Sequence, residues 1–325
     1  MLHVAMLSKW HVHAGGYAKT VLRHENCTIS AVWDEDPERG SAWAEELGCP
    51  FVADLDTLLA DPGVDAVVVN APTDQHGTVL RKAAEAGKHI FTEKVLTLCT
   101  EDALAVAKAV RENGVRFTIS FPHKTANRLQ FVKRLCDSGE LGTLTYARVR
   151  NCHSGSINDW LPPHFYDRKQ CGGGAMIDLG AHPMYLLLWL LGKPVSVQSA
   201  FTNVTDRPVE DNAVSILTFE SGAIGVSETG FVSRCDPYIV EVSGTNGFVR
   251  VSDNTVTYRT VNTPDGAWIV KERPGEAMPN PLDTFLDGCL HGTPEEPMFS
   301  IEDAVELTRL MEAAYRPDAV NGAAL

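Results

Sequence analysis

The amino-acid sequence predicts an α/β protein with an N-terminal doubly wound parallel sheet and a C-terminal α/β domain with an open, mainly antiparallel sheet. In the first third of the chain, short apolar segments alternate with helical patterns, which is typical of a parallel sheet covered on both faces. After about residue 121 the apolar segments become longer and are separated by hairpin-type turns. The chain has 325 residues, enough for two domains, which we expect at residues 1–121 and 122–325.

The first domain is expected to contain short buried strands connected by helices. The expected strands are Val4–Leu7, Thr28–Trp33, Phe51–Val52, Ala66–Asn70, His89–Thr92 and Arg116–Ser120. The expected helices are Pro37–Leu47, His76–Ala86 and Glu101–Asn113. Asp36 and the proline after it mark the start of the first helix, and Gly87 and Gly114 mark the ends of the other two.

The second domain is expected to be built around one sheet. Its expected strands are Leu144–Asn151, Val195–Thr202, Ala213–Phe219, Ala223–Glu228, Tyr238–Val242, Phe248–Ser252 and Val256–Val261. Its expected helices are Ala126–Ser138, Pro281–His291 and Ile301–Tyr315. A sheet with one apolar face must bury that face on helices or on another subunit.

Composition and charge exclude several classes of function. The formal net charge is −14, which argues against binding nucleic acid or an anionic membrane, because both need a basic face. No apolar run approaches the roughly 20 residues of a membrane span, and the N-terminus lacks the pattern of an export signal. The 8 cysteines are scattered without a CxxC pair, as expected for reduced thiols in a cytoplasmic protein.

The ends of the predicted parallel strands carry polar residues where α/β sheets bind ligands. Asp34 ends the second strand and can accept hydrogen bonds from both hydroxyls of a ribose, although it also lies in good helix-capping sequence. The turn after the first strand, residues 7–16, lacks the glycine pattern that usually binds a pyrophosphate. The segments Asn70–His76 and Glu93–Val95 follow the fourth and fifth strands.

A glycine run precedes a second group of polar residues. Gly172–Gly174 leads into a segment that carries Asp178 and His182. Glycines that enter a helix can place backbone N–H groups against a ligand. Because the aspartate and the histidine are four residues apart, we expect them to share one face of a helix.

Taken together, these segments resemble the Gfo/Idh/MocA oxidoreductase family over essentially the whole chain. The motifs are AVVVNAPTDQH, AGKHIFTEK, SGELGTL, GGGAMIDLGAHPMYLLLWLLG, VEDNAVSILTFESGAIG and SIEDAVELTRLMEAAY. The resemblance implies a Rossmann domain followed by an α/β domain with an open sheet. It also implies NAD as cofactor, with NADP disfavoured because Asp34 would repel a 2′-phosphate.

The resemblance further implies the roles of individual residues. Lys94 contacts the substrate and the nicotinamide ribose, His182 is the proton acceptor, and Asp178 either orients the substrate or tunes His182. The expected cofactor-binding residues are Ser8, Trp10, His11, Asp34, Asn70, Pro72, Thr73, His76, Glu93 and Lys94. The expected substrate-binding residues are Lys94, His123, His153, Trp160, Tyr166, Asp178 and His182. Residues 153–170 suit a sugar because they combine aromatic and polar groups, but they also fit a surface loop with a few buried anchors.

Three positions depart from the family pattern. The phosphate loop has Ser8, Trp10 and His13 near the positions where glycines are expected, and Val95 stands where the family has a proline. Tyr185 stands where many relatives carry an acid, so we expect it to alter the choice of substrate. His11 and His13 invite a metal hypothesis, but the sequence offers no third or fourth ligand nearby and therefore predicts no metal site.

The predicted function is an NAD-dependent oxidoreductase that transfers a hydride between a secondary alcohol of a sugar, inositol or related polyol and the nicotinamide. One alternative is a lyase or hydrolase that retains NAD and oxidises the sugar transiently. Another is an inactive sugar- or nucleotide-binding regulator. The open sheet predicts a homodimer or homotetramer.

Overall fold

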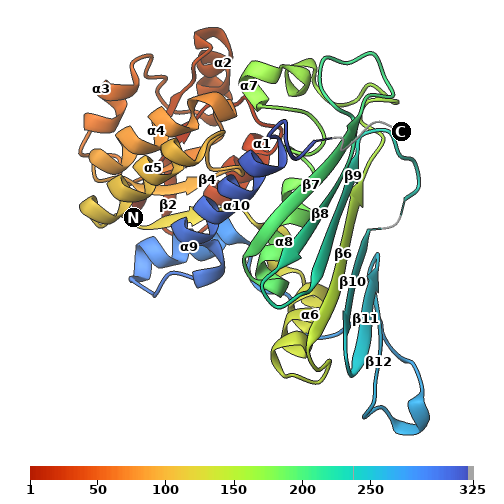
Figure 1. The fold of residues 1–325 in the computed structure, drawn as a ribbon. Coiled ribbons are helices and arrows are strands. Elements are labelled where there is room, and N and C mark those ends of the chain that lie inside the picture. The colour runs from red at the N-terminus through yellow and green to blue at the C-terminus, as the bar shows by residue number, and fades with distance from the viewer. Residues whose placement is uncertain (237, 321–325) are drawn as a thin grey trace. The chain divides into compact units, whose positions relative to one another are not determined.

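The computed structural model describes residues 1–236 and 238–320, and the chain divides into two compact units (Figure 1). Unit 1 comprises residues 1–120 and 279–308, and unit 2 comprises residues 121–278 and the chain from residue 309. The first break falls next to the predicted boundary. Residues 279–308, which we assigned to the second domain, lie in unit 1 instead.

Unit 1 is built on a five-stranded parallel sheet with the strand order β2-β1-β3-β4-β5. The strands are β1 (Leu2–Leu7), β2 (Cys27–Trp33), β3 (Ala66–Val69), β4 (His89–Thr92) and β5 (Phe117–Ile119). This order confirms the doubly wound sheet and reverses between β1 and β3. Ligands of such sheets bind outside the carboxyl ends of the strands at that point.

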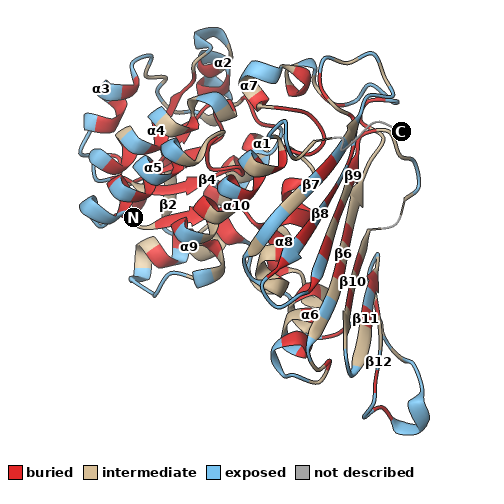
Figure 2. Ribbon diagram, in the orientation of Figure 1, coloured by how far each residue is buried: buried red, intermediate tan, exposed pale blue. Residues whose placement is uncertain are grey.

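The helices of unit 1 cover this sheet. They are α1 (Ala14–Arg23), α2 (Pro37–Leu47), α3 (Leu55–Ala60), α4 (Thr73–Glu85), α5 (Thr100–Asn113) and α9 (Pro281–His291). Helix α9 belongs to unit 1 because Leu282, Phe285 and Leu286 are buried in the same apolar cluster as Met6 and Phe91. Figure 2 shows the sheet of this unit as largely buried.

Two local expectations for unit 1 differ from the structure. The strand expected at Phe51–Val52 is wrong: Phe51 forms only an isolated bridge with Val32. Helix α4 begins at Thr73, before the expected start at His76, because Pro72 occupies its N-cap and a proline is well tolerated at the start of a helix. Helices α1 and α3 were not predicted; α3 is capped by Asp54, whose carboxylate accepts from Thr57 N.

Unit 2 contains an eight-stranded sheet with the order β13-β12-β11-β10-β6-β9-β8-β7. The strands are β6 (Leu144–Cys152), β7 (Pro194–Thr202), β8 (Asn212–Phe219), β9 (Ile224–Gly230), β10 (Ile239–Gly244), β11 (Gly247–Ser252), β12 (Thr255–Thr260) and β13 (Ile269–Lys271). Strands β6 and β9 are parallel and the other neighbours are antiparallel. The predicted open, mainly antiparallel sheet is confirmed.

Helix α8 (Ala181–Leu191) packs on one face of this sheet, against β6 and β9. The other helices of the unit include α6 (Asn127–Asp137) and α7 (Arg168–Cys171). Helix α10 (Ile301–Ala314) begins in unit 1 and ends in unit 2. Within the described residues, no helix is long and apolar enough to cross a membrane.

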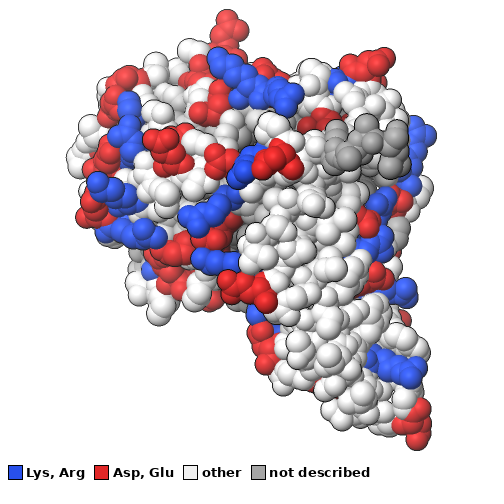
Figure 3. Space-filling model, viewed as in Figure 1, with Lys and Arg blue, Asp and Glu red and all other residues white. Residues whose placement is uncertain are grey.

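The opposite face of the sheet is exposed and partly apolar. Along β8 buried and exposed residues alternate, so Ala213 and Leu217 are buried while Val214 and Ile216 are exposed. Ile224 on β9 is exposed as well. In Figure 3 charged side chains are scarce over β7 and β8. We refer to Val214, Ile216 and Ile224 as the open-face patch.

Candidate active site

The turn after β1 replaces the expected glycines with side chains that are held in place. Ser8 has a φ of 72°, a left-handed conformation in which glycine is usually found. Its hydroxyl accepts a hydrogen bond from Trp10 N at 3.1 Å. Both residues are buried. The chain therefore makes this tight turn without a glycine at residue 8.

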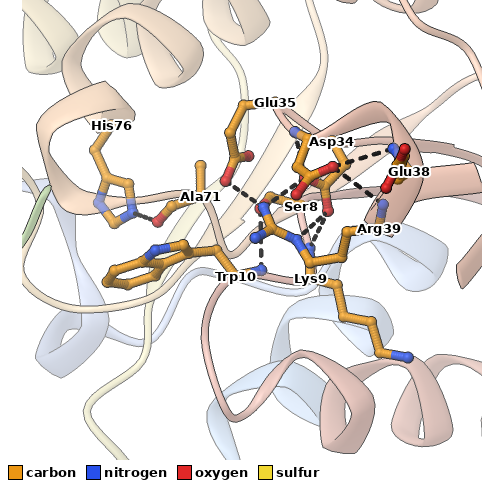
Figure 4. Close-up of polar contacts among 10 residues, drawn as sticks. Ser8, Lys9, Trp10, Asp34, Glu35, Glu38, Arg39, Ala71 and His76 are labelled. Atoms are coloured by element: carbon orange, nitrogen blue, oxygen red, sulfur yellow. Dashed lines mark hydrogen bonds and ion pairs between the residues drawn. The ribbon is translucent and has the colours of Figure 1, made fainter. Parts of the chain in front are cut away.

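Asp34, at the end of β2, is buried and surrounded by donors (Figure 4). Its carboxylate accepts from Lys9 N at 2.8 Å and from Asp36 N at 2.8 Å. Arg39 donates to both of its oxygens, from Nη2 at 2.6 Å and from Nε at 3.0 Å. The carboxylate lies where the sequence predicts it, but an arginine from α2 already holds it.

Glu35 and Arg39 extend this ionic group. Arg39 Nη2 lies 2.5 Å from Glu35 Oε1. Burial, together with the charge of Asp34, raises the pKa of Glu35. Burial alone would lower the pKa of Arg39, but its bonds to Asp34 and Glu35 raise it. One cation thus neutralises only one of two neighbouring carboxylates.

The segment after β3 is tied to the segment after β4 by His76. The Nδ1 atom of His76 lies 2.9 Å from Val95 O, and its Nε2 atom lies 3.0 Å from Ala71 O. Burial lowers the pKa of this histidine. A neutral imidazole can donate to only one of these carbonyls at a time. His76 is thus a buried connection between two loops, and Pro72 and Thr73 begin α4 beside it.

Glu93, at the end of β4, gathers residues from the turn after β1. Its Oε1 atom lies 2.7 Å from His13 Nδ1 and 3.7 Å from His11 Nδ1. Tyr17 also donates to Oε1. Burial alone would raise the pKa of Glu93, but His11 and His13 outweigh burial and lower it well below the usual glutamate value. The glutamate is therefore ionised near neutral pH.

Lys94 follows Glu93 and is buried in unit 1. Its backbone N–H donates to Glu93 Oε2 at 3.1 Å. The Lys94–Val95 peptide bond is cis. The contact with Glu93 fixes the backbone of the lysine next to the carboxyl ends of β3 and β4.

The residues present in unit 1 fit a dinucleotide. Asn70 Oδ1 is buried, and no donor among the described residues reaches it, so it can accept from a ligand. A Cβ added to Gly15 or Gly16, in the first turn of α1, would meet no atom within 4 Å, so a ligand can approach the backbone there closely. Asn70, Asp34 and the start of α1 are the positions that would hold the ribose and phosphate groups.

In unit 2 the expectation that one helix carries both Asp178 and His182 is wrong. Helix α8 begins at Ala181, and Asp178 lies in the turns before it. Asp178 N donates to Gly174 O, but Gly180 N donates to Ala175 O and His182 N to Leu179 O. This mixture of spacings is not the regular pattern of an α-helix, so the two side chains do not share one helical face.

His182 belongs to a group of rings in unit 2. Its Nδ1 atom lies 2.9 Å from Tyr185 Oη, and Tyr185 Oη accepts from His123 N at 3.2 Å. The rings of His123 and His182 lie 4.6 Å apart, and His123 Nδ1 lies 3.1 Å from Tyr238 Oη. His182 and Tyr185 are buried, and burial raises the pKa of Tyr238. We call His123, His182, Tyr185 and Tyr238 the imidazole–phenol group.

The remaining predicted substrate residues form a separate packed cluster. The ring of His153 stacks on Phe231 at 4.8 Å and lies 4.7 Å from the ring of Trp160. Tyr166 is buried, and its hydroxyl lies 3.1 Å from Ser156 Oγ. Trp160 is 53% exposed. Tyr166 and His153 thus anchor the loop, whereas Trp160 is exposed on it.

Sequence reasoning missed several residues that touch the predicted site residues. Among them are Arg39 beside Asp34, Tyr17 beside Glu93 and Tyr238 beside His123. Arg39 had a local signal, because it lies in the first turn of the helix that follows Asp34. Tyr17 and Tyr238 contact residues far away along the chain, so their sequence positions carry no such signal.

The doubly wound parallel sheet of unit 1, with polar residues at its strand ends, defines a nucleotide-binding fold, and comparison with known proteins adds the class of the protein. A family model described as the NAD-binding Rossmann fold of an oxidoreductase family matches residues 12–121. A second model, described as the GFO/IDH/MocA C-terminal domain, matches residues 129–250. The chain belongs to the Gfo/Idh/MocA family of oxidoreductases, and unit 1 is its NAD-binding Rossmann domain.

Several relatives show the range of the family. The chain is 32% identical over 245 residues to scyllo-inositol 2-dehydrogenase (NAD(+)) of Bacillus subtilis, covering 71% of this chain and 69% of that protein. It is 28% identical to 2,7-anhydro-N-acetylneuraminate hydratase of Escherichia coli, covering 72% of this chain and 63% of that protein. The crystal structure of GenD2 from gentamicin A biosynthesis, in complex with NAD, is 28% identical with a TM-score of 0.80. That likeness covers 97% of this chain and 93% of GenD2.

Proposed function

We propose that this protein is an NAD-dependent dehydrogenase that oxidises a secondary alcohol of a sugar, inositol or related polyol. The observation that carries the proposal is a buried imidazole, His182, hydrogen-bonded to Tyr185 in a chain that also contains an NAD-binding domain. The relative that acts on scyllo-inositol supports the class of substrate.

The chemistry assigns a separate task to each residue. Bound NAD supplies the acceptor for the hydride. His182 takes the proton of the substrate hydroxyl, a role that suits imidazole because it can both accept and donate a proton. When Nδ1 carries the proton and donates it to Tyr185, Nε2 is the unprotonated nitrogen that acts as the base. Lys94 stabilises the alkoxide that develops as the proton leaves, and Asp178 orients the substrate.

We infer that NAD is preferred over NADP. Asp34 and Glu35 present two carboxylates to one arginine, Arg39. This excess of negative charge opposes a 2′-phosphate, whereas the carboxylate of Asp34 suits ribose hydroxyls.

The second candidate is an enzyme that retains NAD and uses transient oxidation to eliminate or hydrate a sugar derivative. The relative named as a hydratase favours it. An inactive regulator is less well supported, because Lys94, Asp178 and His182 are all retained.

The test is a panel of monosaccharides, inositols and anhydrosugars, each incubated with the protein and NAD. Net formation of NADH, followed by absorbance, supports the dehydrogenase. Consumption of a sugar without net NADH, followed by chromatography, supports the NAD-retaining enzyme instead. Binding without either reaction would contradict both enzymatic proposals and favour the regulator.

We also propose that the chain forms a homodimer or homotetramer in the cytoplasm. The open-face patch supports self-association, since an exposed apolar sheet face favours burial against a second subunit. Ile216→Glu should lower the mass measured by sedimentation, whereas Val261→Glu, outside the patch, should not. A monomeric wild-type protein at micromolar concentration would contradict this. The eight cysteines form no disulfide with one another, which supports the cytoplasmic location.

A further inference from the structure

Two histidines and a glutamate converge within unit 1. His11 and His13 come from the turn after β1, and Glu93 comes from the end of β4. Their ligand-type atoms all lie within 4.8 Å of one another. The rings of His11 and His13 are 4.6 Å apart. The sequence offered only the two histidines, and the fold adds a carboxylate from 80 residues away.

The three side chains have the chemistry of a metal site. Two imidazoles and one carboxylate are a common ligand set for Zn²⁺ and other divalent transition metals. The ligand atoms of such an ion lie about 3 Å from one another, because each bond is about 2.0–2.2 Å long. The distances from Glu93 Oε1 to the two Nδ1 atoms, 2.7 Å and 3.7 Å, are already close to that spacing.

The surroundings of Glu93 resemble the outer shell of a metal ligand. Its Oε1 atom accepts from Tyr17, whose hydroxyl also lies 2.8 Å from Ser120 Oγ. Its Oε2 atom accepts from Lys94 N at 3.1 Å. Hydrogen bonds of this kind orient a ligating carboxylate. His11 is buried and His13 is 50% exposed at its side chain, so the outer histidine has room to adjust.

We propose that His11, His13 and Glu93 bind a divalent transition-metal ion such as Zn²⁺, with the remaining coordination positions filled by water or an anion. Binding displaces the proton between His13 and Glu93, because each ligating nitrogen must be deprotonated. The proposal does not depend on the substrate of the enzyme, so it can fail or hold separately from the proposed function.

The test titrates Co²⁺ into the chelator-treated full chain without nucleotide and follows the visible absorption of the bound ion. We expect one ion per chain and a spectrum of nitrogen and oxygen ligands, without the near-ultraviolet band of thiolate ligation. His13→Ala should weaken binding by roughly 100-fold or more, since loss of even an outer-shell partner costs 10–100-fold. The side chain of His13 makes no capping hydrogen bond to α1, so this variant should fold.

His3→Ala is the matched control, because His3 also pairs with a carboxylate, Asp65, at 3.2 Å. It should bind Co²⁺ as the wild type does. Glu93→Gln, checked by circular dichroism, should lose binding as His13→Ala does. Absence of Co²⁺ binding by the wild type, equal binding by His13→Ala, or a thiolate spectrum would overturn the proposal.

Discussion

The two units hold their predicted site residues by different kinds of interaction. In unit 1, charged side chains are buried as ionic groups, as for Asp34 with Arg39 and for Glu93 with His11 and His13. In unit 2, the imidazole–phenol group joins two imidazole rings to two phenol hydroxyls. Fixed charges suit recognition of a polar cofactor, whereas an imidazole beside a hydroxyl can give and take a proton. We therefore expect unit 1 to bind the cofactor and His182 of unit 2 to carry out proton transfer.

The strongest test of this division removes the proposed base. His182→Ala should lower kcat by roughly 100-fold or more, with the affinity for NAD largely unchanged because NAD binds to unit 1. Turnover and NAD titration by fluorescence measure the two quantities. His291→Ala, at an exposed position of α9, is the control. Wild-type turnover in His182→Ala would remove this residue from the reaction.

The converse change removes a charge from unit 1. Asp34→Ala should weaken the binding of NAD by roughly 10-fold or more, because hydrogen bonds to a charged group contribute about 1.5–3 kcal/mol. Discrimination against NADP should relax, since Arg39 remains to meet a 2′-phosphate. Titration with both cofactors measures the two affinities. Asp54→Ala, which removes the cap of α3, is the control. Unchanged affinity for both cofactors would show that Asp34 does not contact the ribose.

A smaller effect is expected when the base is kept but loses its hydroxyl partner. Tyr185→Phe should lower kcat by roughly 5-fold, the equivalent of one hydrogen bond of about 1 kcal/mol. The KM for NAD should stay constant, and the pH profile of kcat should shift because the partner of His182 Nδ1 is lost. Tyr146→Phe on β6 is the control. An unchanged pH profile would argue that Tyr185 serves packing alone.

The smallest effect concerns an ionic group of unit 2 that lies outside the imidazole–phenol group. Glu228 on β9 bonds Arg148 at 2.7 Å and Arg150 at 3.0 Å on β6. Burial alone would raise the pKa of Glu228, but the two arginines lower it below 4.5. Its stabilising contribution is therefore full above pH 4.5 and is lost as the pH falls through the lower, folded-state pKa.

Glu228→Gln should thus lower the free energy of unfolding by about 1 kcal/mol at neutral pH, with no direct effect on proton transfer. The difference from wild type should shrink in acid, as measured by denaturant titration at several pH values. Glu220→Gln, in an exposed turn, is the control. A difference that is the same at all pH values would contradict the assigned charge interaction.

Local signals predicted much of the fold. The apolar run at Ala66–Val69 indicated a buried parallel strand, and the alternation along β8 indicated a sheet with one buried face. Asp34 could be predicted as a ribose-binding candidate because its position at the end of a strand is visible in the neighbouring sequence. The sequence motifs likewise identified the family, which the comparisons confirm.

Contacts between distant residues could not be predicted in this way. Glu93 reaches His11 and His13 because β1 and β4 both flank β3, a fact of strand order. The prediction of a helix through Asp178 was wrong because the backbone hydrogen bonds before Ala181 are irregular. A spacing of four residues in the sequence cannot reveal this. The catalytic roles of these residues stay predictions.

The parallel pairing of β6 with β9 has a consequence for how unit 2 assembles. Strands β7 to β9 and strands β10 to β13 each follow one another in the chain, whereas β6 is made first and lies between the two sets. Arg148 and Glu228, which meet across that junction, are 80 residues apart. Closing so long a loop slows folding more than forming consecutive hairpins does. We expect the pairing of β6 with β9 and with β10 to be late and rate-limiting, and a chain that stops before β9 should lack a continuous sheet.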